Sequence, residues 1–201
     1  IFEHKHWGMN FKLIPPVKKL TDGELMLKIR KGQEKAFEEL YRRYARRLQG
    51  FFYRMLGGDK ELAADFTQEI FERIWKFRDK YTVGEQVSAW IFTMAYNVCR
   101  NEYRHREVAD NYLWQMADEE EAGDSNIEVH LDEQAFDCAL AKVLENLPPE
   151  PRMLFALRYE EELTLTEIAE IMHLPVGTVK SRNHYLIALI KQKLHQYETN
   201  R

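Results

Sequence analysis

The sequence predicts an all-α protein made of two small helical domains joined by an acidic linker, with a helix-turn-helix in the C-terminal domain. Apolar residues recur at three- and four-residue steps along almost the whole chain, which is the period of a helix. Patterns that would predict strands are nearly absent. One acidic stretch without sustained periodicity separates the two periodic regions, and we interpret it as the linker.

The composition excludes several classes of protein. Of the 201 residues, 45% are hydrophobic and 31% charged, and no apolar run approaches the roughly 18–20 residues that cross a bilayer. No signal-peptide pattern is present, so we expect a cytoplasmic protein without membrane insertion. Cys99 and Cys138 lack the spacing of a zinc site or a redox pair, so we expect reduced thiols, no metal and no cofactor. Residues 1–19 form an N-terminal extension, whose start before Met9 is consistent with part of a tag or upstream read-through.

The charge is unevenly distributed along the chain. The net charge is −4, but residues 107–134 hold ten acidic residues and no Lys or Arg. Without that segment the remaining residues carry a net charge of +6. Residues 40–54 contain five arginines and no acid, and residues 173–201 contain five basic residues against one acid. The net negative charge of the chain is therefore compatible with binding to nucleic acid, because the acidic residues are concentrated in one segment.

Four helices are predicted for an N-terminal domain spanning residues 20–106. Thr21 and Glu24 fit a capping box that begins the first, short helix. A long helix follows, and Gly57-Gly58 ends it. The third and fourth helices are expected at about 61–77 and 86–106, separated by a loop at about 80–87.

The acidic linker is placed at residues 107–134, and the C-terminal domain at 135–201. Its helices are expected at 135–147, 150–159, 166–172 and 176–196. Thr164 and Glu167 form a second capping box, and His173 is the expected residue of positive φ in the turn that follows. Pro175 suits the first turn of the last helix.

The last helix presents two different faces. Val176, Val179, Leu186 and Ile190 are expected to face the core. Small, hydroxylated and basic residues are expected outward, as on a helix that enters the major groove: Gly177, Thr178, Lys180, Ser181, Arg182 and His184. Taken alone, this pattern also fits a helical hairpin with a solvated polar face.

Three stretches of the sequence, one in the C-terminal half and two in the N-terminal half, resemble one known family. Residues 147–182, LPPEPRMLFALRYEEELTLTEIAEIMHLPVGTVKSR, resemble the fourth conserved region of bacterial RNA polymerase sigma factors, most closely the extracytoplasmic-function group. Residues 65–77, DFTQEIFERIWKF, resemble the polymerase-binding helix of the family's second region. Residues 88–106, SAWIFTMAYNVCRNEYRHR, resemble the adjoining helix that opens and reads promoter DNA. The motifs follow the family's order and cover most of residues 20–195.

The resemblance implies a non-enzymatic sigma factor that binds core RNA polymerase and promoter DNA, with an anti-sigma factor as a further partner. Polymerase contacts are implied for Asp65, Gln68 and Glu69, which could otherwise be an ordinary solvated face. Contacts to the minus-ten element are implied for Trp90, Asn97, Arg100, Asn101, Arg104 and Arg106, and contacts to the minus-thirty-five element for Thr178, Lys180, Ser181, Arg182 and His184. Trp90 and Tyr103 are equally candidates for core packing.

The resemblance weakens after Arg182. Relatives commonly continue with SRLHRAR, whereas this chain has SRNHYLI, so Asn183, Tyr185 and Ile187 stand where Leu, Arg and Arg are usual. Fewer cations should reduce the salt-dependent part of DNA affinity. The apolar residues from Tyr185 to Leu194 would form an apolar surface larger than one core needs. We expect part of this surface to contact another protein, such as the polymerase flap or an anti-sigma factor.

Two other functions are compatible with parts of the sequence. A helix-turn-helix regulator that acts without polymerase would share the C-terminal motif. An enzyme would need a catalytic motif, and the sequence has no HExxH, nucleophile elbow or phosphate-binding loop.

Overall fold

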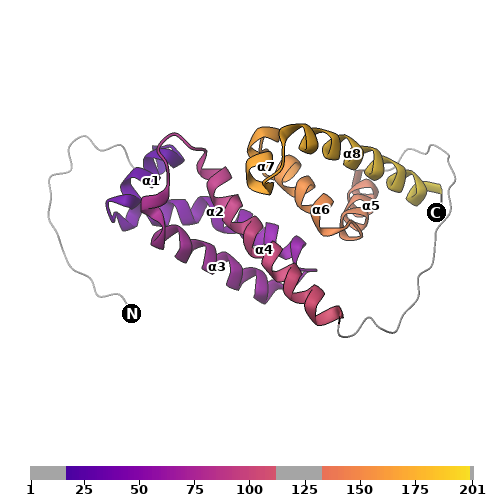
Figure 1. The fold of residues 1–201 in the computed structure, drawn as a ribbon, viewed down its shortest axis with the longest axis horizontal. Helices are drawn as coiled ribbons and strands as arrows, with labels where there is room; N and C mark the ends of the chain where they lie inside the picture. The colour runs from indigo at the N-terminus through magenta and orange to yellow at the C-terminus, as the bar shows by residue number, and fades with distance from the viewer. Residues whose placement is uncertain (1–16, 112–132, 200–201) are drawn as a thin grey trace.

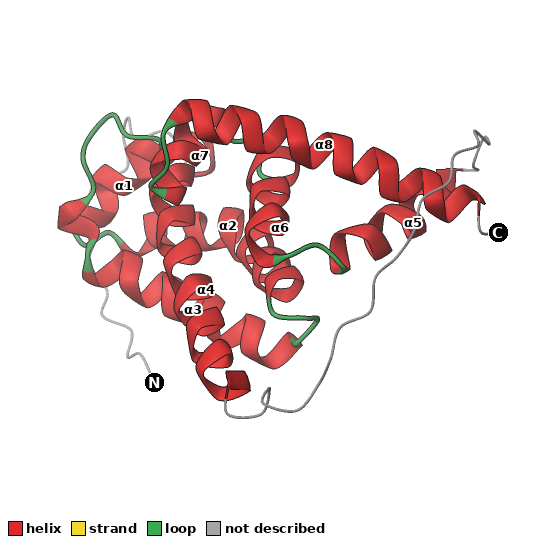
Figure 2. Cartoon of the chain, turned by 45° about the vertical axis from the view of Figure 1, so that its right-hand side comes forward, coloured by secondary structure: helices red, strands yellow, loops and turns green. Residues whose placement is uncertain are grey.

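The computed structural model describes the backbone of residues 17–111 and 133–199. Within these ranges the chain forms helices and turns and no strand, which confirms the all-α prediction (Figure 2). The N-terminal extension before Val17 and most of the predicted linker lie outside the described residues. The helices fall into two groups, an N-terminal and a C-terminal domain, that lie side by side (Figure 1).

The N-terminal domain contains four α-helices and two short 3-10 turns. In chain order these are η1 (Val17–Lys19), α1 (Asp22–Arg30), α2 (Glu34–Met55), α3 (Lys60–Lys76), η2 (Arg78–Lys80) and α4 (Val87–Asn111). The predicted capping box is formed, because the Glu24 backbone N–H bonds Thr21 Oγ1 at 3.3 Å and the Thr21 N–H bonds Glu24 Oε2 at 2.7 Å. The helix α4 continues five residues beyond the predicted end at Arg106.

Gly57 and Gly58 end α2 as predicted. Both have positive φ, at 72° and 85°, and the Gly58 N–H bonds the Tyr53 carbonyl at 2.9 Å. This left-handed backbone is strained for residues with a side chain, so glycine is the suitable residue here. The turn lets α3 fold back along α2.

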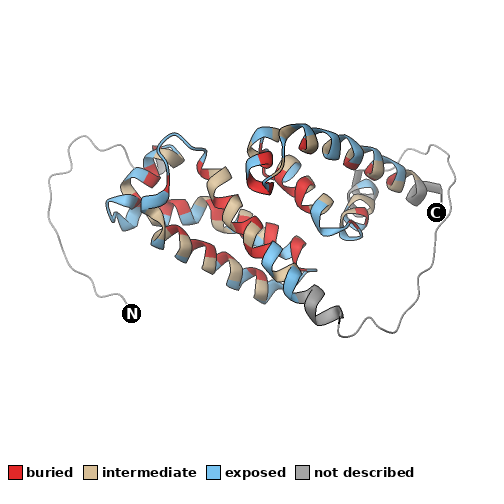
Figure 3. Cartoon of the chain, in the orientation of Figure 1, coloured by how far each residue is buried: buried red, intermediate tan, exposed pale blue. Residues whose placement is uncertain are grey.

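The core of this domain is aromatic and fully enclosed. Phe51 and Phe92 are both unexposed, and their rings meet edge to face with centroids 5.5 Å apart. The sequence pattern places Leu62, Phe66, Ile70 and Ile74 on one face of α3; Ile70 and Ile74 are buried, whereas Leu62 and Phe66 are half-buried against the core. Buried residues follow the inward faces of the helices (Figure 3).

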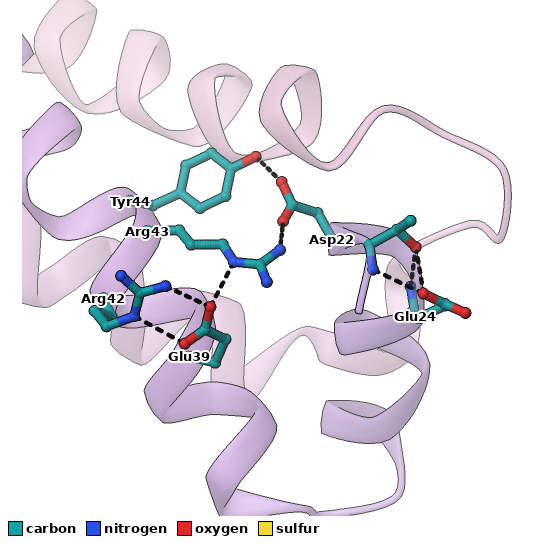
Figure 4. A network of polar contacts seen from close by, with 7 residues as sticks. Asp22, Glu24, Glu39, Arg42, Arg43 and Tyr44 are labelled. Atoms are coloured by element: carbon teal, nitrogen blue, oxygen red, sulfur yellow. Dashed lines mark hydrogen bonds and ion pairs between the residues drawn. The ribbon is translucent and has the colours of Figure 1, made fainter. Parts of the chain in front are cut away.

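A polar network fixes α1 against α2 (Figure 4). Asp22 accepts hydrogen bonds from Arg43 at 2.6 Å and from the Tyr44 hydroxyl at 2.5 Å. Glu39, which is almost fully buried, accepts from Arg42 and Arg43. Its hydrogen bond with Arg42, with a smaller contribution from Arg43, lowers the pKa of Glu39 to about 2. Two of the five arginines in residues 40–54 are therefore bound within the domain.

The C-terminal domain contains α5 (Glu133–Glu145), α6 (Pro149–Phe155), the π-helical turn η4 (Ala156–Glu160), α7 (Leu165–Met172) and α8 (Val176–Thr199). The sequence predicted one helix over 150–159, but the structure changes from α- to π-helical geometry at Ala156. Glu161 closes the turn through an N–H bond of 3.0 Å to the Ala156 carbonyl, and Glu162 has a φ of +57°. This irregular turn leads into the helix-turn-helix.

The helix-turn-helix is formed by α7 and α8. The Thr164 capping box is present, and His173 has the predicted left-handed backbone, with φ 55° and ψ 45°. Pro175 lies just before α8 and not inside its first turn, and its carbonyl accepts hydrogen bonds from Thr178 at 2.9 Å and Val179 at 3.1 Å. Since Pro175 has no N–H to satisfy, it is well suited to this position.

The two domains are in contact. In the structure α7 packs against α4, and α6 packs against α2. Figures 1 and 2 both place the turn end of the helix-turn-helix beside α4. The first helix of the DNA-recognition motif therefore lies against the helix expected to read the minus-ten element.

Candidate polymerase and promoter interfaces

The predicted polymerase-binding residues lie on the outer face of α3. Asp65 and Gln68 are exposed and Glu69 is half-buried, while Ala63, Thr67 and Ile70 on the opposite side are buried. The spacing of i, i+3 and i+4 brings the three outer residues together on one helix face. The result is an accessible stripe of two carboxylates and an amide.

Two further residues belong to this stripe, and the sequence analysis did not single them out. Gln68 Nε2 donates to Glu72 at 2.9 Å, and Arg73 Nε donates to Glu69 at 2.9 Å. Both pairs are four residues apart, so the helical spacing was the available signal. Arg73 partly neutralises Glu69 in the free chain, whereas Asp65 and Glu72 form no ion pair with other described residues.

The predicted minus-ten residues lie along α4, and their exposure to solvent increases along the helix. Trp90 is half-buried and packs on the core, with its ring centroid 5.7 Å from that of Tyr81. Asn97 is half-buried, whereas Arg100, Asn101 and Arg104 are exposed. The Arg106 side chain lies outside the described residues. The exposed members combine two guanidiniums with an amide, which suits a single strand of DNA.

The loop before α4 is held by its own contacts. The Tyr81 side chain is 2% exposed, and its hydroxyl donates to the Glu85 carbonyl at 2.7 Å. Tyr103 is anchored as well, through a hydrogen bond of 2.6 Å from its hydroxyl to the Met55 carbonyl. These aromatics therefore support the loop and the helix, and the packing alternative for Trp90 and Tyr103 matches their positions.

The predicted minus-thirty-five residues lie on the first three turns of α8. Lys180, Ser181, Arg182 and His184 are exposed and Thr178 is half-buried, while Val179 and Leu186 on the opposite side are buried. The Ser181 hydroxyl donates back to the carbonyls of Gly177 and Thr178, at 3.0 and 3.1 Å. Arg182 Nη1 lies 2.7 Å from Glu150 Oε2 on α6. Glu150 was not predicted, and its distance of 32 residues along the chain gives no sequence signal for the pair.

The residues after Arg182 are partly explained by packing. Asn183 is half-buried, and its Oδ1 accepts a hydrogen bond of 3.1 Å from the Tyr159 hydroxyl on the π-helical turn. Leu186, Ile190 and Leu194 are buried core residues, whereas Tyr185 is 67% exposed. Only part of the apolar sequence is thus available as surface. Tyr185 borders a cavity of about 290 Å³ between α6 and α8, lined also by Leu154, Leu189 and Arg182.

Comparisons with known proteins agree with this geometry. The family model for sigma-70 region 2 matches residues 40–108, which contain α3 and most of α4, and the model for sigma-70 region 4 matches residues 139–184. The chain is 32% identical over 179 residues to the ECF RNA polymerase sigma factor SigW of Bacillus subtilis, with 80% of this chain and 92% of that protein covered. It is 30% identical over 172 residues to the ECF RNA polymerase sigma-E factor of Escherichia coli K12, covering 81% of this chain and 88% of that protein.

A solved structure has the same fold. The sigma factor RpoE of Bartonella quintana, crystallised with the anti-sigma factor NepR, superposes with a TM-score of 0.62 at 22% identity, covering 80% of this chain and 97% of that one. Among the described residues no helix is long and apolar enough to cross a membrane. The chain belongs to the sigma-70 family, in its ECF group, and is a sigma factor that acts with RNA polymerase to direct transcription initiation.

Proposed function

We propose that the two domains divide the work of promoter recognition. The N-terminal domain, residues 20–106, binds core polymerase and melts the minus-ten element, and the C-terminal domain, residues 135–201, binds the minus-thirty-five element. The acidic segment 107–134 links them. The observation that carries this proposal is that each domain presents its candidate residues on an exposed helix face whose opposite face is buried.

Polymerase binding is assigned to the outer face of α3. Asp65, Gln68 and Glu69 supply negative charge and hydrogen-bond acceptors for a basic surface of the polymerase. Arg73 would exchange its intramolecular contact with Glu69 for solvent when that surface binds. Partially exposed ion pairs of this kind contribute little stability, so the exchange is small in free energy.

Minus-ten recognition is assigned to the exposed face of α4. Asn97 and Asn101 are four residues apart, and so are Arg100 and Arg104, so the helix places two amides and two guanidiniums in neighbouring rows. Amides can hydrogen-bond an unpaired base, and guanidiniums can track the phosphates. Trp90 would support this helix from within the core, and Arg106 continues the basic row in sequence.

Minus-thirty-five recognition is assigned to the start of α8. Thr178, Lys180, Ser181, Arg182 and His184 lie where a recognition helix contacts base edges and phosphates. Arg182 is best suited to a base contact because a guanidinium binds guanine through two hydrogen bonds. Contact with DNA requires its release from Glu150.

The remaining assignments concern partners and location. The RpoE structure contains an anti-sigma factor, and we assign an anti-sigma partner to this chain as well. The chain works in the cytoplasm, where core polymerase and the promoter are, and has no catalytic activity of its own.

Site-specific photocrosslinking tests the division between the domains. A photoreactive amino acid at position 97 should crosslink to the minus-ten region of a promoter in the complex with core polymerase. The same amino acid at position 180 should crosslink to the minus-thirty-five region. A crosslink from position 97 to upstream duplex would contradict the assignment. Efficient, sequence-specific crosslinking without polymerase would favour a polymerase-independent regulator.

A further inference from the structure

Ser181, on the outer face of α8, uses its hydroxyl proton within its own helix. The hydroxyl donates to the Gly177 carbonyl at 3.0 Å and to the Thr178 carbonyl at 3.1 Å. Such bonds back to the preceding turn are a common arrangement of helical serine. A serine hydroxyl carries one proton and two lone pairs. Because the proton is shared between two helix carbonyls, the oxygen can only accept a hydrogen bond from a molecule outside the protein.

The Ser181 side chain is accessible across Gly177. Both residues are exposed and lie four positions apart, so they occupy one row of the helix surface. A Cβ placed on Gly177 would meet no atom within 4 Å. Packing inside the protein therefore does not require glycine here, and glycine is a poor helix former. The missing side chain leaves room for a base edge to come close to the Ser181 oxygen.

An oxygen that only accepts hydrogen bonds discriminates among the groups of duplex DNA. Phosphate oxygens are acceptors themselves, so they cannot bind it. In the major groove the donors are the amino groups of adenine N6 and cytosine N4, whereas guanine and thymine present acceptors. Arg182, the next residue, has the opposite chemistry, because a guanidinium only donates and suits guanine. The two neighbouring side chains therefore select different bases.

We propose that Ser181 is a specificity-determining residue of the minus-thirty-five contact, whose hydroxyl oxygen accepts a hydrogen bond from the amino group of one adenine or cytosine. The inference rests on the proposed assignment of the minus-thirty-five element to the start of α8, and it names the class of base that this position reads. A guanine or thymine in the same place faces the oxygen with a second acceptor and is rejected.

Selection from a promoter library locates the base pair that Ser181 reads. Core polymerase transcribes templates randomised across the minus-thirty-five region, with the wild type or with Ser181→Ala. One position of the selected block should lose its preference in Ser181→Ala, and the other positions should keep theirs. The variant should fold, since alanine favours a helix more than serine does. Lys191→Ala, exposed farther along α8, is the control and should keep every preference.

Base analogues at that position identify the atom that Ser181 contacts. Each base pair contains one adenine or cytosine, and purine in place of adenine or zebularine in place of cytosine removes its amino group. This change should lower initiation by the wild type roughly two- to ten-fold more than initiation by Ser181→Ala, as expected for one neutral hydrogen bond. A deaza analogue of the purine in the same pair removes the N7 acceptor instead, and should affect both proteins equally. Weakened base pairing acts on both proteins and cancels in the comparison.

The outcomes separate the role of Ser181 from the assignment of α8. If the wild type selects no minus-thirty-five block, the assignment of α8 fails, and the role of Ser181 with it. If the block is present but Ser181→Ala relaxes no position, or if loss of the amino group affects both proteins equally, only the role of Ser181 is overturned. If instead the N7 change affects the wild type more than Ser181→Ala, Ser181 donates a hydrogen bond, which also overturns the proposal.

Discussion

The Arg182 guanidinium, on the recognition helix, lies 2.7 Å from the Glu150 carboxylate of α6. Both side chains are well exposed, at 43% and 63%, so the pair itself adds little to stability. The pair matters for function, because Arg182 is expected to contact DNA and its charge is neutralised by Glu150 in the free chain. On the proposed assignment, DNA would compete with Glu150 for this guanidinium.

Arg182→Ala should weaken initiation at promoters that depend on the minus-thirty-five element. A lost bidentate base contact corresponds to about 1–3 kcal/mol, or roughly 5- to 150-fold. The measurement is in vitro transcription on paired templates with the upstream element intact or scrambled. Lys191→Ala, an exposed position farther along α8, serves as control. Equal loss on both templates would assign Arg182 to phosphate binding.

Glu150→Gln should have the opposite effect. The amide cannot neutralise Arg182, so the free guanidinium gains in its attraction to DNA and the affinity should rise several-fold at low salt. The salt dependence should become steeper, as expected when a cation is available for counterion release. Fluorescence anisotropy of promoter complexes across a salt series measures both quantities. A lower affinity would mean that Glu150 orients Arg182 productively.

Charge reversal on α3 tests the polymerase face. Asp65→Lys/Glu69→Lys should abolish co-purification with core polymerase, because a basic stripe would face the surface that now receives acids. Placing lysine beside Arg73 should destabilise the helix by only about 0.2–0.5 kcal/mol, so the circular dichroism spectrum should be preserved. Glu38→Lys, an exposed position on α2, is the control. Retained binding in the double variant would refute the assigned role.

The fold follows from the sequence because its signals are local. The two capping boxes at Thr21 and Thr164, the glycine stop after α2 and the left-handed His173 each depend on a few adjacent residues, and the structure contains all of them. Helical periodicity placed the remaining boundaries within a few residues. The π-helical turn at Ala156 was missed because its geometry depends on how the chain enters the helix-turn-helix, which no short pattern encodes.

The contacts between residues far apart in the chain could not be predicted from the sequence. Nothing in the spacing of Arg47 and Glu161, 114 residues apart, predicts that they pair. The stretch 40–54 holds five arginines and no acid, yet Arg42 and Arg43 bind acids of their own domain and Arg47 and Arg54 bind acids of the other. The apolar residues of α8 were likewise ambiguous, since tertiary packing decides that Leu186 is buried and Tyr185 exposed.

Acid should destabilise the chain partly through Glu39. Its pKa is about 2 in the folded chain against an ordinary value of 4.5, so the ionised form is favoured by folding. This stability is present above about pH 4.5 and is lost as the pH falls toward 2. Glu39→Gln should therefore be less stable than the wild type at pH 7, with a smaller difference at pH 3. Urea unfolding at both pH values measures this, with Glu38→Gln as control. A difference independent of pH would contradict it.

Thr164→Ala should loosen the helix-turn-helix without touching its DNA-binding face. Thr164 Oγ1 accepts the Glu167 N–H at 3.2 Å, and loss of such a cap destabilises a helix by about 1 kcal/mol. The melting temperature of a domain of this size should fall by about 4–8 °C. Thr166→Ala, exposed on the same helix, should melt close to the wild type. Equal melting temperatures of the two variants would show that the cap does not stabilise the helix.

Transcription from a randomised promoter library by core polymerase, with and without this protein, measures most directly whether the chain acts through polymerase at two promoter elements. The predicted result is initiation only when the protein is present, from templates enriched in two separate sequence blocks near −10 and −35. Initiation without enrichment, or enrichment of one tightly bound duplex site in the absence of polymerase, would contradict it.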